Sequence, residues 1–224
     1  MLLRFRALFS AALLFFPLAG CSSGPAIEGD DEDITNIPQS GVKNQTDTGN
    51  CWLYATSAWI ESLSADPQTG ATKDYSTAYL VYWNFYDQIL HAEKGFHGVE
   101  WTGGSWGAAS ELVLRYGLME LEAFTGAKKE DADADLAMGT LARVNESLKR
   151  GALRSKAARK DPVLVRRELD KAFNLKPALV DAMNRAFGED GARTFDSGAT
   201  PEGGIISPAA IQVRAPAHGD ARPE

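Results

Sequence analysis

Helical spacing of apolar residues is the feature that most constrains the fold of this chain of 224 residues. From Cys51 to Leu63, apolar side chains recur every three or four positions with no Gly or Pro between them, which predicts a helix. The same spacing predicts helices over 75–91, 106–116, 136–149, 162–173 and 177–187. Only residues 118–124 read as a strand, and residues 128–135 read as an acidic loop. We therefore expect a mainly helical body.

The segment 75–91 is unusually aromatic. Tyr79, Tyr82, Trp83 and Tyr86 recur at helical spacing within it. Bulky aromatic side chains at this spacing are typical of a helix that is buried along most of its surface. We therefore predict that these four residues belong to the core rather than to a ligand site.

Residues 1–20 read as a targeting signal. Arg4 and Arg6 precede an apolar stretch that is too short to span a bilayer as a mature helix. The following Leu18-Ala19-Gly20-Cys21 resembles the lipobox of bacterial lipoproteins, and this resemblance implies cleavage before Cys21 and acylation of that residue. The chain would then be held at the membrane by lipid on Cys21, in the bacterial cell envelope, with Ser22 favouring the outer membrane. An ordinary signal peptide followed by a chance cysteine is the alternative.

Composition divides the remainder into a tether, a body and a tail. Residues 21–41 are small and acidic and read as a flexible tether, residues 42–190 carry the helical patterns, and residues 191–224 read as a poorly ordered tail. The chain has 23 basic and 30 acidic residues. Removing residues 1–20, which contain two Arg and no acid, leaves 21 basic and 30 acidic residues, a formal charge of about −9. No broad basic field exists, so we do not expect nucleic acid as a partner.

The two cysteines, Cys21 and Cys51, would by number alone allow one disulfide. A lipid on Cys21 excludes that pairing. Cys51 would then be the only thiol of the mature chain.

The surroundings of Cys51 favour a reactive thiol. The residue stands at the amino end of a predicted helix, where free N–H groups and the helix dipole favour a thiolate. Gly49 allows close approach of the backbone, and the N–H of Cys51 itself can face a developing oxyanion. Gln45, six residues earlier, carries an amide donor that a turn can bring to the same oxygen. The segment thus holds a candidate nucleophile and its oxyanion donors.

At these residues the chain resembles the papain-like cysteine peptidases, and most closely their bleomycin hydrolase branch. The matching residues are Gln45, Gly49, Cys51, Trp52, Tyr54 and Ala55. Residues 75–83 resemble the second helix of that branch, and Gly103-Gly104-Ser105-Trp106 with residues 114–119 resemble its Gly-Gly, helix, Tyr-Gly passage. The resemblance covers residues 42–125, and residues 136–187 more weakly as a helical insertion.

The resemblance implies an α+β papain-like fold, represented mainly by the helical, cysteine-bearing half and its insertion. Cys51 would be the nucleophile and Gln45 part of the oxyanion hole. Gly103 and Gly104 would bind an extended peptide through main-chain hydrogen bonds. No cofactor is implied, and no His, Cys and carboxylate cluster has metal-ligand spacing. Other interpretations stay open: a buried apolar Cys51, a surface turn at Gln45 and a plain loop at Gly103-Gly104.

Such a peptidase also needs a histidine to carry the thiol proton. The chain contains His91, His97 and His218, and none lies about 130–150 residues after Cys51, the usual spacing. His91 and His97 lie at the end of the second predicted helix, where a solvated or capping role is expected, and His218 has no strand pattern around it. The expectation is that the β-rich half is missing, through early termination, a shifted frame or an unusual natural tail.

The sequence therefore predicts one of two functions. The first is a lipid-anchored cysteine peptidase acting on peptides or proteins, either active or inactive for want of a suitable histidine. The alternative is a non-catalytic envelope lipoprotein that binds peptides or proteins.

Overall fold

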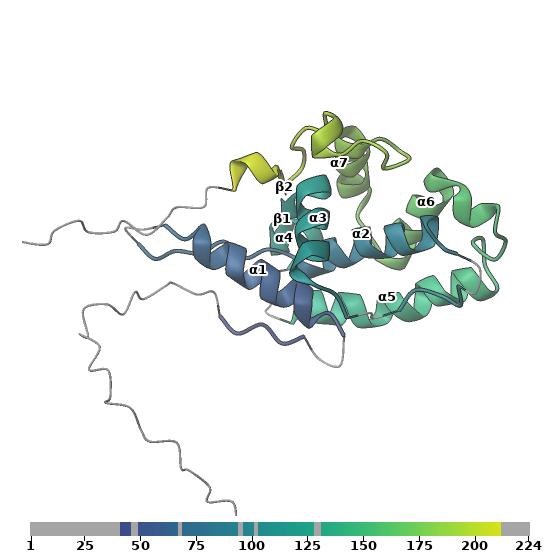
Figure 1. Cartoon of the computed structure of the whole chain (residues 1–224), viewed down its shortest axis with the longest axis horizontal. Coiled ribbons are helices and arrows are strands. Elements are labelled where there is room, and N and C mark those ends of the chain that lie inside the picture. The colour runs from purple at the N-terminus through teal and green to yellow at the C-terminus, as the bar shows by residue number, and fades with distance from the viewer. Residues whose placement is uncertain are drawn as a thin grey trace, which may run out of the picture. The chain divides into compact units, whose positions relative to one another are not determined.

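A computed structural model describes residues 41–45, 49–66, 69–93, 96–100, 103–127 and 131–211. These residues form a mostly helical body with a small sheet of two short strands (Figure 1). The α-helices are α1 (Cys51–Leu63), α2 (Thr77–Leu90), α3 (Trp106–Tyr116), α4 (Leu121–Thr125), α5 (Ala132–Lys149), α6 (Pro162–Ala172) and α7 (Pro177–Phe187). Strands β1 (Leu118–Met119) and β2 (Ile205–Ile206) and short 3-10 turns η2 (Ala158–Lys160), η3 (Phe195–Ser197) and η4 (Pro208–Ala210) complete it.

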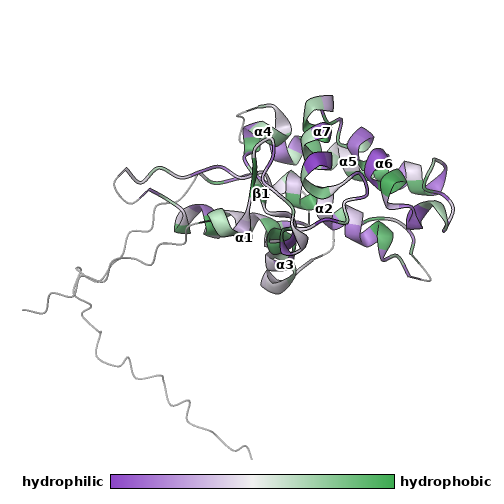
Figure 2. Ribbon diagram, turned by 90° about the horizontal axis from the view of Figure 1, so that it is seen from above, coloured by the Kyte–Doolittle hydropathy of each residue, from purple (hydrophilic) through white to green (hydrophobic). Residues whose placement is uncertain are grey.

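Helix α2 lies in the middle of the body and packs against α1, α3, α5 and α6 (Figures 1 and 2). It begins at Thr77 because the Ser76 hydroxyl accepts a hydrogen bond from the Tyr79 N–H at 3.1 Å, a standard N-cap. Most of its residues are buried. Green and purple alternate along the surrounding helices in Figure 2, as expected for helices that turn one face to a core.

The aromatic side chains of α2 form the centre of the core, as predicted. Tyr79, Tyr82 and Trp83 are fully buried and Tyr86 is nearly so. The Trp83 ring stacks on Tyr116 of α3 with centroids 3.9 Å apart, and its edge contacts Phe187 of α7 at 4.9 Å. The prediction of a core position for these residues is confirmed.

A buried arginine ties α6 to this aromatic core. Arg166 is 1% exposed and lies over the Trp83 ring at 5.2 Å. Its Nη1 donates to the carbonyl of Gly188 at 2.6 Å, and its Nε donates to the Tyr82 hydroxyl at 3.2 Å. Burial alone would lower the pKa of Arg166, but interaction with Tyr82 and Asp170 raises it, so the guanidinium stays charged.

The predicted strand over 118–124 is too long. Leu118 and Met119 pair antiparallel with Ile206 and Ile205, and Leu121–Thr125 then forms the short helix α4. Beyond this pair, the Met119 carbonyl accepts from the Ser76 N–H and the Leu121 N–H donates to the Asp74 carbonyl, each at 2.8 Å, and the chain then turns into α4, where the Phe124 N–H donates to the Glu120 carbonyl.

Two further boundaries differ from the sequence prediction. The predicted acidic loop 128–135 overlaps α5, which begins at Ala132, because Asp133 and Asp135 in its first turn favour the positive end of the helix dipole. The predicted tail 191–224 starts with ordered structure, since η3, β2 and η4 lie within residues 191–211 and Ile205 is buried. The strand pair with β1 holds this segment on the body.

Several predictions fall outside the described residues. These concern the signal 1–20, Cys21 with nearly all of the tether 21–41, and His218. No helix in the described part of the chain is both long and apolar enough to cross a bilayer.

A buried carboxylate joins α5 to the start of α2. Asp133 is 3% exposed and accepts hydrogen bonds from the Ser76 hydroxyl at 2.7 Å and from the Thr77 N–H at 2.5 Å. Burial raises the pKa of Asp133 to about 6, and the bonds from Ser76 and Thr77 oppose that rise.

This pKa predicts a loss of stability as the pH rises. Between pH 4 and 7 the unfolded chain ionises Asp133 before the folded chain does, so the free energy of unfolding should fall by about 2 kcal/mol from this group. Urea unfolding of wild type and Asp133→Asn across this range measures the difference. The exposed Asp135→Asn on the same helix is the control, and a constant wild-type-minus-Asp133→Asn difference would contradict the prediction.

Candidate functional site

Cys51 is the first residue of α1, and its side chain is free and exposed. The turn before it is closed by Asn50, whose carbonyl accepts from the N–H groups of Leu53 at 2.8 Å and Tyr54 at 3.2 Å. Cys51, Ala55 and Trp59 are exposed at intervals of four residues, so one apolar stripe of α1 faces outward. The interpretation of Cys51 as a buried apolar residue is therefore wrong.

Gln45 and Cys51 line the same hollow, which has a volume of about 550 Å³. Lys43, Tyr54 and Trp59 also line it. Burial raises the pKa of the Tyr54 hydroxyl, and the charges of Asp133 and Asp131 raise it further, so this phenol stays protonated. The fold thus brings the candidate nucleophile and the candidate oxyanion donor to one place.

A partly buried ionic network holds the segment that carries Gln45. The Lys43 ammonium lies 2.5 Å from Glu61 Oε1 and 2.6 Å from Asp74 Oδ1, and it donates to the Tyr75 carbonyl at 2.9 Å. Glu61 Oε1 also accepts from the Tyr75 N–H at 2.7 Å. Burial lowers the pKa of Lys43, but its carboxylate partners more than compensate and raise it. Residue 43 is thereby joined to α1 and to the start of α2.

Gly103 and Gly104 differ in their surroundings. A Cβ on Gly104 would overlap the Trp52 indole, whereas a Cβ on Gly103 would meet nothing within 4 Å. Trp52 directly follows Cys51, so its contact with Gly104 places the Gly-Gly segment next to the start of α1. Residues 45, 51 and 104 are thus brought into one region, although residue 104 follows residue 51 by 53 positions in the sequence.

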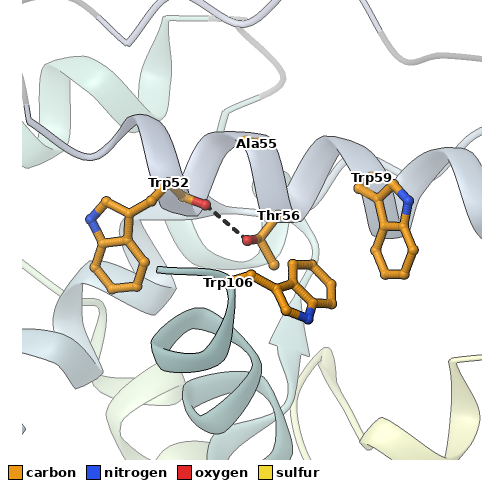
Figure 3. Close-up of a pocket in the computed structure, with 5 residues that line it drawn as sticks. All are labelled: Trp52, Ala55, Thr56, Trp59 and Trp106. Carbon is orange, nitrogen blue, oxygen red and sulfur yellow. Dashed lines mark hydrogen bonds between the residues drawn. The ribbon is translucent and has the colours of Figure 1, made fainter. Parts of the chain in front are cut away.

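A second hollow, of about 350 Å³, continues along α1 (Figure 3). Trp52 and Trp59 of α1 border it, with Trp106 from the start of α3 between them in the view of Figure 3. The Trp59 and Trp106 rings meet edge to face at 4.6 Å, and each side chain is about half exposed. The Thr56 hydroxyl is occupied by a bond to the Trp52 carbonyl, so the walls are almost entirely apolar.

The two described histidines lie elsewhere. His91 and His97 line a separate hollow at the carboxyl end of α2, together with Gln88 and Phe96. His91 is the C-cap of α2 and its Nδ1 lies 3.0 Å from the Asp87 carbonyl, which agrees with the predicted capping role. Within the described part of the chain, no histidine lines the hollow of Cys51.

Three features of this region were not predicted from the sequence. Glu61 occupies the buried face of α1, and a carboxylate on an apolar stripe signals a cationic partner, here Lys43. The pairing of Trp59 with Trp106 had no signal, because it depends on how α3 crosses α1. Asn50 is 1% exposed with neither polar side-chain atom bonded among the described residues, and nothing in the structure explains this.

No model of a protein family matches the chain, and no curated protein does. Among the described residues, no three His, Cys, Asp or Glu side chains are placed to hold a metal ion.

The contact between Gly104 and Trp52 gives a prediction with an internal control. Gly104→Ala should displace the Trp52 indole and lower the free energy of unfolding by about 1–3 kcal/mol, as overpacking does. Gly103→Ala adds the same methyl group in open space and should stay within about 0.5 kcal/mol of wild type. Urea unfolding compares the two, and equal losses would show that the Trp52 contact is not rigid.

Proposed function

We propose that the chain is a papain-like cysteine peptidase in which Cys51 is the nucleophile. The observation that carries the proposal is that Gln45 and Cys51 line one hollow at the amino end of α1, beside Trp52 and Gly104. A thiol, a backbone N–H and a side-chain amide gathered at a helix start are suited to acyl transfer.

In the proposed reaction the Cys51 sulfur attacks the carbonyl carbon of a peptide bond. The oxyanion that forms accepts hydrogen bonds from the Cys51 N–H and the Gln45 amide. The carbon–nitrogen bond then breaks, the amine leaves with the proton that the thiol has lost, and a thioester remains on Cys51. Water hydrolyses this thioester, which releases the acid and restores the thiol.

The two hollows favour a peptide with a bulky apolar side chain as substrate. An extended peptide beside Gly103 would have free space over that glycine for main-chain hydrogen bonds. The apolar hollow of Trp52, Trp59 and Trp106 lies next to the thiol and offers aromatic surface to a neighbouring side chain. Its size of about 350 Å³ suits one large side chain better than a folded surface.

One observation favours a second candidate, a non-catalytic protein that binds peptides. Hydrolysis needs a base to carry the thiol proton, and His91 and His97 line a different hollow. In that case the same hollows hold a peptide and Cys51 forms no acyl intermediate.

Acylation by an activated ester separates these functions, because phenolate leaves without a proton. With the p-nitrophenyl ester of an N-acyl phenylalanine, we expect a thioester on Cys51, detected by intact mass and absent in Cys51→Ser. Gln45→Ala should slow its formation about 100-fold, the usual cost of one oxyanion donor. Gln88→Ala, which removes the same side chain from the hollow at the end of α2, should leave the rate unchanged.

Acylation no faster than that of free cysteine, or equally fast in Gln45→Ala, would contradict the peptidase proposal. Binding of the corresponding phenylalanine peptide by Cys51→Ser, measured by tryptophan fluorescence, would then support the non-catalytic binder.

We also propose, from the lipobox resemblance alone, that Cys21 is acylated and anchors the protein in the bacterial envelope. Expression of the full chain in a bacterium supplied with labelled palmitate tests this. We expect label in the wild type and none in Cys21→Ser, with Cys51→Ser labelled like the wild type. Equal labelling of both serine variants and wild type would refute acylation at Cys21.

A further inference from the structure

The corner between α5 and α6 concentrates positive charge on a protein that is acidic overall. Residues 149–160 contain six of the 23 basic residues, and no acid occurs between residues 147 and 160. We call these six the basic corner: Lys149, Arg150, Arg154, Lys156, Arg159 and Lys160. The net charge of −7 hides this local surplus.

Most of the charges in the basic corner face outward. All but Arg159 are exposed. Arg150 pairs with Glu146 at 3.3 Å, and Lys160 donates to the Leu90 carbonyl. Lys149, Arg154 and Lys156 form no ion pair or side-chain hydrogen bond with the described residues. Three unneutralised cations therefore lie within eight residues.

The basic corner is built on a fixed backbone. Leu153 in its middle is fully buried in the core. Arg159 lies over the Phe96 ring at 5.9 Å and donates to the Arg154 carbonyl at 2.9 Å, and the Ala158 N–H bonds to Ser155 Oγ at 3.1 Å. The backbone that carries these charges is thus held in place, so that only the side chains have to be ordered when an anionic surface binds.

We propose that the basic corner is a docking surface for an anionic phospholipid membrane. Lipid phosphates attract clustered Lys and Arg side chains that lie near the membrane surface. Exposed Ala152, Ala157 and Val163 place small apolar groups among the charges, which a headgroup layer accommodates. No exposed aromatic side chain lies within residues 147–163 to stack on a base, as binding of single-stranded nucleic acid would need.

The basic corner also suits a chain tethered to a membrane. The roughly 20 residues between Cys21 and Val42 reach about 70 Å when extended, whereas α5 is only about 27 Å long. Any face of the body can therefore touch a membrane to which Cys21 is anchored.

Docking through the basic corner would leave the candidate site open. In Figure 1 the basic corner lies where α5 ends and α6 begins, at the end of the body away from α1. Helix α1, which carries Cys51, packs instead on α2 and α3. A peptide could then enter the Cys51 hollow while the other end of the body rests on lipid.

Vesicle sedimentation of the full chain carrying Cys21→Ser tests the proposal without help from an acyl chain. We expect binding to vesicles of phosphatidylcholine and phosphatidylglycerol, release at high salt, and little binding to phosphatidylcholine alone. Replacing Lys149, Arg150, Arg154 and Lys156 by Gln should weaken binding by up to about 1,000-fold, about fivefold for each charge. The control replaces the exposed Lys73, Lys176, Arg185 and Arg193 by Gln, which removes the same charge elsewhere.

Equal weakening in the two fourfold variants would overturn the proposal, because net charge rather than the basic corner would then govern binding. No binding to the anionic vesicles would also overturn it, and so would binding of duplex DNA alone that the corner variant loses. Circular dichroism of both variants checks that neither has unfolded. None of these results depends on peptidase activity or on acylation of Cys21.

Discussion

The stacking of Trp83 on Tyr116 is the contact on which the remainder of the structure depends. It fixes α3 against α2, and the same indole receives Phe187 from α7 and Arg166 from α6. Helices that are distant in sequence thus converge on one side chain. Because α3 is held there, its first residue, Trp106, contacts Trp59 on the face of α1 that bears Cys51.

The candidate site is assembled from elements that the core holds in different ways. Cys51 is positioned by the start of α1, and this helix packs on α2 and α3. Gln45 lies two residues after Lys43, which forms an ion pair with Glu61 of α1. Trp52 fits against Gly104, where a side chain would not fit. The Lys43–Glu61 ion pair, the glycine at position 104 and the start of α1 therefore each contribute separately to the candidate site.

The helices could be predicted because their apolar period reflects burial on one face. The ranges for Trp106–Tyr116 and Pro177–Phe187 are confirmed, and Ser76 explains why α2 starts two residues later than predicted. The strand over 118–124 could not be bounded, since its length depends on β2, almost 90 residues later. The ordered part of the segment after residue 190 could not be predicted for the same reason, because β2 within it pairs with the distant β1.

The site was predictable only where neighbours in sequence decide it. Cys51 at a helix start and Gln45 six residues earlier are local features, and the structure brings them to one hollow. The pairing of Trp59 with Trp106 and the partner of Glu61 come from tertiary packing. The basic corner can be read from the sequence, but the net charge of the whole chain, −7, does not reveal it.

Two of the three tryptophans around the apolar hollow, Trp59 and Trp106, differ from the core residue Trp83 in their contact with water. Trp83 is buried in a fixed environment, whereas Trp59 and Trp106 are about half exposed and contact each other. Indole emission depends on contact with water, so these two rings emit at longer wavelength than Trp83 does. A ligand that fills the hollow displaces water from the Trp59 and Trp106 rings and shifts their emission to shorter wavelength. Binding at this site can therefore be followed by the intrinsic fluorescence of the protein.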